Sequence, residues 1–335
     1  MHLRSRLSPL SAVFTMIAVL AATPVRAVDN PILDRFLPAD TEVLVRINVE
    51  QALDSALVKK LGLDQVRDQL KQIEELDAAL KELDFDPFLD VATITFAAPD
   101  SNEQDRLLVI VRGKFKLDKF KAKGEDLAKN MGEVVKLHKV ADGAGGQVNV
   151  YEVRLPEQDQ PLFVALPNET TLLVSPGKDY VADAIKRGKA KTPVELKNKS
   201  FQALLEKMDP KQTLALAAIG EALAKNPAGE GALNAALAKI DALGGGITLT
   251  EDVKLELVVG AKTVQEAREL KKTIDNGVTQ GLLLVGLLAM KEEKLAPVVD
   301  VLKSVRCNAK DKTVTIKAEV SAEVLQAIQK ALGGQ

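Results

Sequence analysis

The order of apolar and polar residues along the chain predicts an alternation of strands and helices. Residues 107–123 begin with a nearly continuous apolar run, typical of a strand covered on both faces, and continue into a lysine-rich amphipathic segment with a helical period. The same order recurs at residues 255–271, where Lys262 takes the place of Lys114. The recurrence suggests that most of the chain arose by internal duplication of one unit.

The first copy is expected to contain four helices and seven strands. The apolar period of a helix predicts residues 51–61, 64–83 and 179–186, besides the lysine-rich helix. Runs of alternating or continuous apolar residues predict strands at residues 41–49, 91–97, 106–113, 134–140, 147–153, 161–166 and 170–175. The glycine-rich stretch 143–146 is expected to be a hairpin loop.

The second copy is expected to repeat this order with one change. A long helical stretch at residues 277–303 takes the place of the hairpins between residues 134 and 166. The glycine cluster 244–246 is expected to form a turn. The other predicted elements are strands at 211–219, 247–250, 254–260 and 313–320, and helices at 222–243, 264–274 and 322–332.

Together these elements predict an α+β fold of two tandem related lobes, each a mainly antiparallel sheet with helices packed on one face. The polar, proline-containing stretch 188–199 is expected to link the lobes. The predicted boundaries are a signal peptide at 1–27, a first lobe at 28–187, the linker at 188–199 and a second lobe at 200–335.

The first 27 residues have the pattern of a secretory signal peptide. Arg4 and Arg6 precede a mostly apolar run at residues 10–22, and small residues occupy the positions before a cut after Ala27. The run is shorter than the roughly 20 residues that span a bilayer. We therefore expect a periplasmic or secreted bacterial protein without a membrane span after cleavage.

Composition narrows the possible chemistry. Removing Arg4, Arg6 and Arg26 with the signal leaves 42 basic and 47 acidic residues, a net charge of −5, which is poorly suited to nucleic acid. Cys307 is the only cysteine and His138 is the only histidine after the signal. A zinc site of ordinary composition cannot be assembled from these two, so no metal or cofactor is predicted.

The patterns that resemble catalytic motifs have simpler explanations. Ser175 and Lys178 have the spacing of a penicillin-recognising enzyme, but the companion motifs are missing, so Ser175 is expected to be a cap or turn residue. His138 fits the polar face of a strand. A cluster of carboxylates around Pro87 is expected to be a polar helix end rather than a calcium site; it comprises Glu82, Asp84, Asp86 and Asp90.

Charge is segregated along the first lobe. Residues 64–103 carry eleven acidic and three basic residues, whereas residues 106–139 carry ten basic and four acidic residues. Two solvated faces explain this pattern. The alternative is a basic face that docks an acidic partner, such as the acidic helix of another copy; this face comprises Lys114, Lys116, Lys119, Lys121 and Lys123.

Residues 281–290 form an uncharged apolar decapeptide. At about 1.5 Å per residue a helix of this length is too short to cross a membrane. A helix that is apolar on all sides is usually buried. The alternatives are a partner-binding helix, a subunit interface or a lipid-facing surface, formed by Leu282, Leu283, Leu284, Val285, Leu287 and Leu288.

Three segments of the sequence resemble those of a known family. FLPADTEVLVRINVEQALDSALVKK, FDPFLDVATITFA and LLVIVRGKF are similar to uncharacterised exported bacterial proteins with a leucine-proline-alanine-aspartate opening. The resemblance extends over essentially the whole chain after the signal. It implies no assigned activity, and no functional residues follow from it.

Three functions are consistent with the sequence. The first is an exported, non-enzymatic binding, scaffold or cell-envelope protein, whose partner is another protein or a second copy. The second is a carrier of a small apolar ligand held under the helix at residues 277–290. The third is a hydrolase that uses carboxylates or lysine alone, since no complete catalytic constellation is present.

Overall fold

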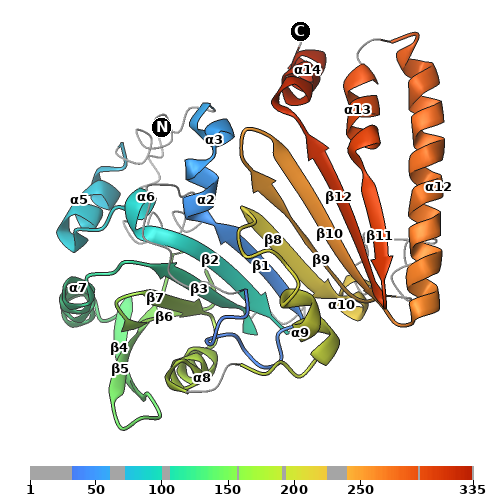
Figure 1. The fold of residues 1–335 in the computed structure, drawn as a ribbon. Coiled ribbons are helices and arrows are strands. Elements are labelled where there is room, and N and C mark those ends of the chain that lie inside the picture. The colour runs from blue at the N-terminus through green and yellow to red at the C-terminus, as the bar shows by residue number, and fades with distance from the viewer. Residues whose placement is uncertain are drawn as a thin grey trace. The chain divides into compact units, whose positions relative to one another are not determined.

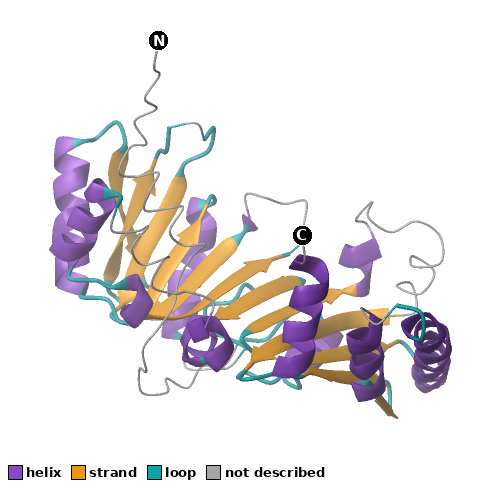
Figure 2. Cartoon of the chain, turned by 90° about the horizontal axis from the view of Figure 1, so that it is seen from above, coloured by secondary structure: helices purple, strands orange, loops and turns teal. Residues whose placement is uncertain are grey.

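A computed structural model of the chain describes residues 32–60, 72–99, 106–156, 158–190, 194–224, 240–292 and 295–333 (Figures 1 and 2). The predicted signal peptide lies outside these ranges. The chain divides into two compact units. The first contains the residues up to Lys197, except for Glu42–Val45 and Ser55–Leu57, which belong to the second unit with Asn198–Gln335.

The strands of the first unit follow the order β1-β2-β3-β7-β6-β5-β4, although the first three residues of β1 are assigned to the second unit. Each neighbouring pair from β2 to β4 is antiparallel. The predicted strands are therefore confirmed, with small shifts at their ends. They are β1 (Val43–Asn48), β2 (Val91–Ala98), β3 (Leu108–Gly113), β4 (Val135–Ala141), β5 (Gln147–Val153), β6 (Leu162–Asn168) and β7 (Thr171–Ser175).

The helices of the first unit are shorter near the N-terminus than the sequence predicts. The helix expected at 51–61 is two short helices that meet at Ser55, and the expected helix 64–83 lies partly outside the described residues. The helices are α2 (Val49–Asp54), α3 (Ala56–Lys60), α5 (Glu74–Leu83), α6 (Pro87–Asp90), α7 (Leu117–Asn130) and α8 (Lys178–Lys189).

Helices α7 and α8 cover opposite faces of this sheet. Tyr151 of β5 lies against Gly124 of α7, and its hydroxyl donates to the carbonyl oxygen of Lys121 at 3.3 Å. On β4, His138 lies 3.2 Å from Lys178 of α8. Leu137 is the cross-strand partner of Tyr151, and successive strand residues point to opposite faces. The sheet therefore carries helices on both faces rather than on one.

The second unit has the strand order β11-β12-β10-β9-β8, and every neighbouring pair is antiparallel. The α+β class with antiparallel sheets is thus confirmed. No element was predicted at β11, where the sequence RCNAK has few apolar residues. The strands are β8 (Leu214–Ile219), β9 (Ile240–Leu249), β10 (Val253–Ala261), β11 (Arg306–Lys310) and β12 (Thr313–Val320).

Strand β9 corrects two expectations. Its first four residues were expected to end the helix 222–243, of which residues 225–239 lie outside the described part. Its glycines 244–246 lie inside the strand and do not form a turn. A Cβ on Gly245 would lie 2.4 Å from the carbonyl oxygen of Glu256, and one on Gly244 would lie 2.9 Å from the sulfur of Met208. Glycine is present because neighbouring atoms approach the strand closely.

The helices of the second unit begin and end at other residues than predicted. The expected helices 264–274 and 277–303 are replaced by one helix of 26 residues, α12, and a separate helix α13. Across the part of the chain that the structure describes, no helix is both long and apolar enough to cross a membrane. The helices are α9 (Lys199–Leu205), α10 (Gly220–Ala224), α12 (Val264–Ala289), α13 (Ala296–Ser304) and α14 (Ala322–Gly333).

Strands that correspond in the two halves of the sequence also correspond in sheet order. In the first unit this order is β1-β2-β3-β7, and in the second it is β8-β9-β10-β12. A helix follows the third strand in both cases, α7 after β3 and α12 after β10. This agreement is compatible with duplication, which stays a prediction from the sequence.

Candidate docking surface and binding pocket

Helix α12 is anchored by its first half. Thr263 caps the helix, because its hydroxyl oxygen accepts the amide hydrogen of Glu266 at 3.1 Å. One face of this half packs on the sheet: Ala267 is fully buried in a cluster with Val259 and Val314, and Leu270 borders it. The helix start is therefore fixed by a cap and by apolar packing.

The outward face of α12 changes character along its length. Its first turns are polar, with exposed side chains that include Glu269, Lys272, Asn276 and Gln280. From residue 283 the exposed side chains are apolar. We call these residues the leucine stripe: Leu283 (66% exposed), Leu284 (63%), Leu287 (65%), Leu288 (46%) and Met290 (84%).

The expectation that residues 281–290 are buried is therefore wrong. Only one side of this segment is covered, where Leu282 and Val285 are half-buried and a Cβ on Gly281 would lie 3.6 Å from Leu302 of α13. Apolar residues occur on all sides of the helix, but α13 packs against one of them. The exposed leucines leave the interface alternatives open.

The basic face of α7 is largely paired within the chain. Lys116 and Lys119 form ion pairs with Asp84, at the end of α5, and Lys123 pairs with Glu82 at 2.6 Å. The hydrogen bond from Lys116 holds the pKa of Asp84 below its ordinary value. Of the five predicted residues, Lys114 and Lys121 are exposed and have no ion pair among the described residues. The acidic stretch thus meets the basic one within a single copy.

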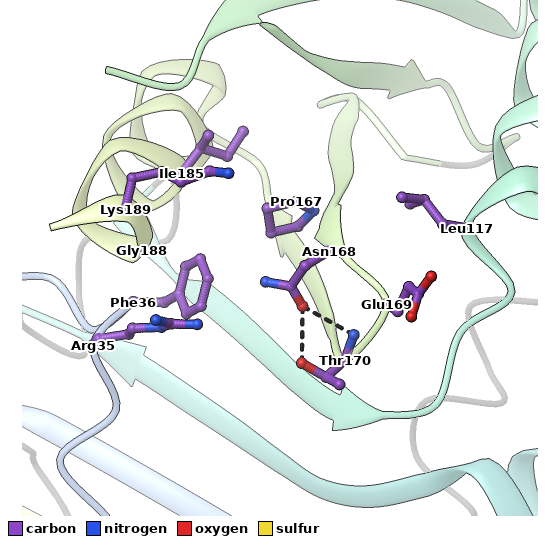
Figure 3. Close-up of a pocket in the computed structure, with 10 residues that line it drawn as sticks. All are labelled: Arg35, Phe36, Leu117, Pro167, Asn168, Glu169, Thr170, Ile185, Gly188 and Lys189. Atoms are coloured by element: carbon purple, nitrogen blue, oxygen red, sulfur yellow. Dashed lines mark hydrogen bonds between the residues drawn. The ribbon is translucent and has the colours of Figure 1, made fainter. Parts of the chain in front are cut away.

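The first unit contains a pocket of about 700 Å³ (Figure 3). Its walls come from residues 32–42, which we call the lead-in before β1, and from the turn between β6 and β7, the start of α7 and the end of α8. This pocket was not predicted, because its walls come from four segments that are far apart in the sequence. The lining residues are Arg35, Phe36, Leu117, Pro167, Asn168, Glu169, Thr170, Ile185, Gly188 and Lys189.

Cationic side chains gather around Phe36. The guanidinium of Arg35 lies 5.5 Å from the centre of the Phe36 ring, and that of Arg112 lies 4.9 Å from it. Arg187 donates to the backbone oxygen of Phe36 at 3.2 Å. Lys189 reaches Asp142 at 3.6 Å. This side of the pocket therefore carries more positive than negative charge.

Behind Phe36 lies a buried polar network. Arg112 forms a two-point ion pair with Asp34 and also donates to the hydroxyl of Thr171 at 2.6 Å. Arg46 of β1 is almost fully buried, and burial lowers its pKa to about 10, while nearby Asp34 opposes that shift. Arginine inside an apolar strand, as in VLVRIN and LVIVRG, is the sequence signal that indicates such a network.

A second charged group lies on α8. The hydroxyl of Tyr180 donates to Asp40 at 3.0 Å, and Arg106 forms an ion pair with the same carboxylate. Burial is the main cause of a raised pKa at Tyr180. These contacts tie α8 to the lead-in that supplies Arg35 and Phe36, and so fix two walls of the pocket.

The carboxylates around Pro87 serve as local caps. Asp86 accepts the amide hydrogen of Phe88 at 2.8 Å, and Asp90 accepts that of Asp86 at 2.7 Å. Burial raises the pKa of Asp90. These residues line a second pocket of about 500 Å³. Within the described ranges, no three His, Cys, Asp or Glu side chains are grouped so that they could hold a metal ion.

His138 and Ser175 make structural contacts. His138 lies 2.9 Å from Glu152 through Nε2 and 3.2 Å from Lys178 through Nδ1. Ser175 is fully buried, and its Oγ accepts the amide hydrogen of Gly177 at 3.1 Å, as expected for a turn residue. The hydroxyl is thus engaged by the turn that leads into α8.

Comparisons with known proteins assign the chain to no family. No family model matches the chain, and no curated protein matches it. Among solved structures it is similar to crystal form I of TP0453, with 11% identity over 91% of this chain and 98% of that chain and a TM-score of 0.38. Form IV gives 9% identity, coverage of 88% and 94%, and a TM-score of 0.40. Similarity at this level supports no functional argument.

Proposed function

We propose that this is an exported, non-enzymatic binding protein that docks through the leucine stripe, and that a second copy of the chain is its partner. The observation that carries the proposal is the exposure of four leucines in the last turns of α12 and of Met290, the C-cap residue that follows them. Single exposed leucines are common on protein surfaces. A contiguous group of them marks an interaction site, because water contact with apolar surface is unfavourable.

A second copy suits the stripe because an interface with two-fold symmetry pairs a surface with itself. The stripe carries no charge, and polar residues bound it, with Gln280 before it and Lys291 and Glu292 after it. Two antiparallel copies would therefore place leucine against leucine without opposing like charges.

The size of the leucine stripe determines how tightly two copies are expected to bind. Stable interfaces use about 20 to 30 residues on each side. Five side chains supply the apolar centre of such an interface but little of its rim. We therefore expect a weak dimer that forms with increasing concentration.

Sedimentation velocity of the chain without residues 1–27 tests this proposal. The wild-type average mass should rise with concentration, and the Leu284→Gln/Leu287→Gln variant should stay monomeric. Lys272→Gln, on the polar part of the same face, is the matched control and should behave as the wild type. A wild-type chain that stays monomeric at every concentration contradicts the second copy as partner. Binding to lipid vesicles that the leucine variant loses would assign the stripe to a lipid surface.

Export rests on the signal-peptide pattern of residues 1–27. Expression in a bacterium should yield a mature chain that begins at Val28 and is released with the periplasmic or secreted fraction. N-terminal sequencing of the fractionated protein measures both. A chain that keeps Met1 and stays in the cytoplasm would contradict export.

A further inference from the structure

We infer that the pocket of Figure 3 is a binding site for a small organic anion, with an apolar body and one carboxylate or phosphate group directed to Arg35 and Lys189. The site belongs to the first unit and is independent of the leucine stripe, so it adds a ligand to the proposed function.

The size and walls of the pocket suit a small molecule. Its volume of about 700 Å³ lies within the roughly 300–1,000 Å³ of most ligand sites. Pro167 and Leu117 give apolar wall surface, and the buried side chains of Phe36 and Ile185 lie beneath it. Because Phe36 is held by neighbouring arginines, this floor is in place before a ligand arrives.

The charges of one side favour an anion. Arg35 is exposed and forms no ion pair among the described residues, so its guanidinium is available to a ligand. Lys189 is 45% exposed and forms an ion pair with Asp142 at 3.6 Å, and its ammonium group has further N–H donors for a ligand. Arg187, next to Phe36, adds positive charge, and its buried Nε has no hydrogen-bond partner in the described structure. Guanidinium groups bind carboxylate and phosphate oxygens through paired hydrogen bonds.

Asn168 gives the site a direction. Its Oδ1 accepts hydrogen bonds from the amide and the hydroxyl of Thr170, both at 2.9 Å. Its Nδ2 points towards Phe36 (Figure 3) and can donate to a bound acceptor. The carboxylate of Glu169 lies on the other side of Asn168, near Leu117 (Figure 3). It repels a second negative charge, so the ligand carries its anionic group at one end.

Titration with matched aromatic probes tests the site by NMR chemical shifts or calorimetry. Benzoate and phenyl phosphate should bind saturably, whereas benzylamine and benzyl alcohol should not. Arg35→Gln and Lys189→Gln should each weaken benzoate binding about tenfold, as expected for a lost charged hydrogen bond. Glu169→Gln should tighten it. Lys186→Gln, on the same helix but paired with Asp183, is the control and should leave the affinity unchanged.

Three results would overturn the inference: no saturable binding of either anion, equal binding of benzylamine, or affinities that the Arg35, Lys189 and Glu169 variants leave unchanged. If Arg35→Gln lowers the melting temperature, Glu169→Gln decides, because Glu169 is exposed. The Leu284→Gln/Leu287→Gln variant should bind benzoate as the wild type does. A failure of the pocket is therefore distinguishable from a failure of the docking surface.

Discussion

Asp34 and Arg112 lie 78 positions apart and form a two-point ion pair, with Nε 2.7 Å from Oδ2 and Nη2 2.6 Å from Oδ1. Both side chains are nearly buried, at 7% and 13% exposure. The pair fastens the lead-in before β1 to β3. Because Arg112 also lies against Phe36, the same contact holds the floor of the pocket.

Asp34→Ala should lower the free energy of unfolding by about 3–5 kcal/mol, because it leaves the buried charge of Arg112 without its partner. Denaturant unfolding measures the change. Asp183→Ala, which breaks an exposed ion pair with Lys186 on α8, should change the free energy by less than about 1 kcal/mol. Equal losses in the two variants would mean that the buried pair does not fasten the lead-in.

Glu152 should contribute a pH-dependent part of the stability. The hydrogen bond with His138 is the largest cause of a pKa below the ordinary value for Glu152. A carboxyl group with a depressed pKa in the folded state stabilises the fold above its unfolded pKa and loses that contribution as pH falls. The wild type should therefore lose stability below about pH 4.5 more steeply than Glu152→Gln. Urea unfolding midpoints of the wild type and of Glu152→Gln should be measured at several pH values from neutral to acid. If the two midpoints fall in parallel with pH, Glu152 does not contribute the pH-dependent stability.

Two helical glycines should respond to alanine in opposite directions. A Cβ on Gly188 would lie 2.1 Å from the ring of Phe36, so Gly188→Ala should cost about 1–3 kcal/mol of stability. A Cβ on Gly277 of α12 would meet no atom within 4 Å, so Gly277→Ala should add about 0.5–1 kcal/mol through helix propensity. Thermal unfolding of both variants shows whether each is more or less stable than the wild type. Destabilisation by Gly277→Ala would show that the outward face of α12 is covered.

The salt dependence of self-association distinguishes the two partner surfaces that we predicted from the sequence. Self-association through the uncharged leucine stripe should persist when the salt concentration is raised, whereas association through the lysines of α7 should weaken. Sedimentation at low and high sodium chloride measures this. A dimer that dissociates in salt would favour the lysine face, where Lys114 and Lys121 remain exposed.

The sequence predicted the strands of the first unit well because the period of apolar residues follows from which faces are covered. The prediction failed where the burial of a segment depends on a second segment that lies elsewhere in the sequence. The glycines of β9 looked like a turn, yet they lie in a strand that Met208 and Glu256 approach closely. Likewise, apolar residues on every side of 281–290 predicted burial, but the sequence could not show that α13 covers one side only.

The pocket was beyond prediction for the same reason. Arg35 and Lys189 belong to segments far apart in the chain, and no motif connects them. The only local signal was an arginine within an apolar strand, at Arg46 and Arg112. That signal indicates a buried charge that needs partners, but it does not say which cavity lies beside them.

The most direct test of the docking surface is thiol cross-linking of single-cysteine chains in a Cys307→Ser background. Leu287→Cys lies within the stripe, and Lys272→Cys lies on the polar part of the same helix face. With a short bifunctional thiol reagent, we expect covalent dimers from Leu287→Cys at concentrations where Lys272→Cys stays monomeric. Equal yields from both positions, or no dimer from Leu287→Cys, would contradict a second copy docked on the leucine stripe.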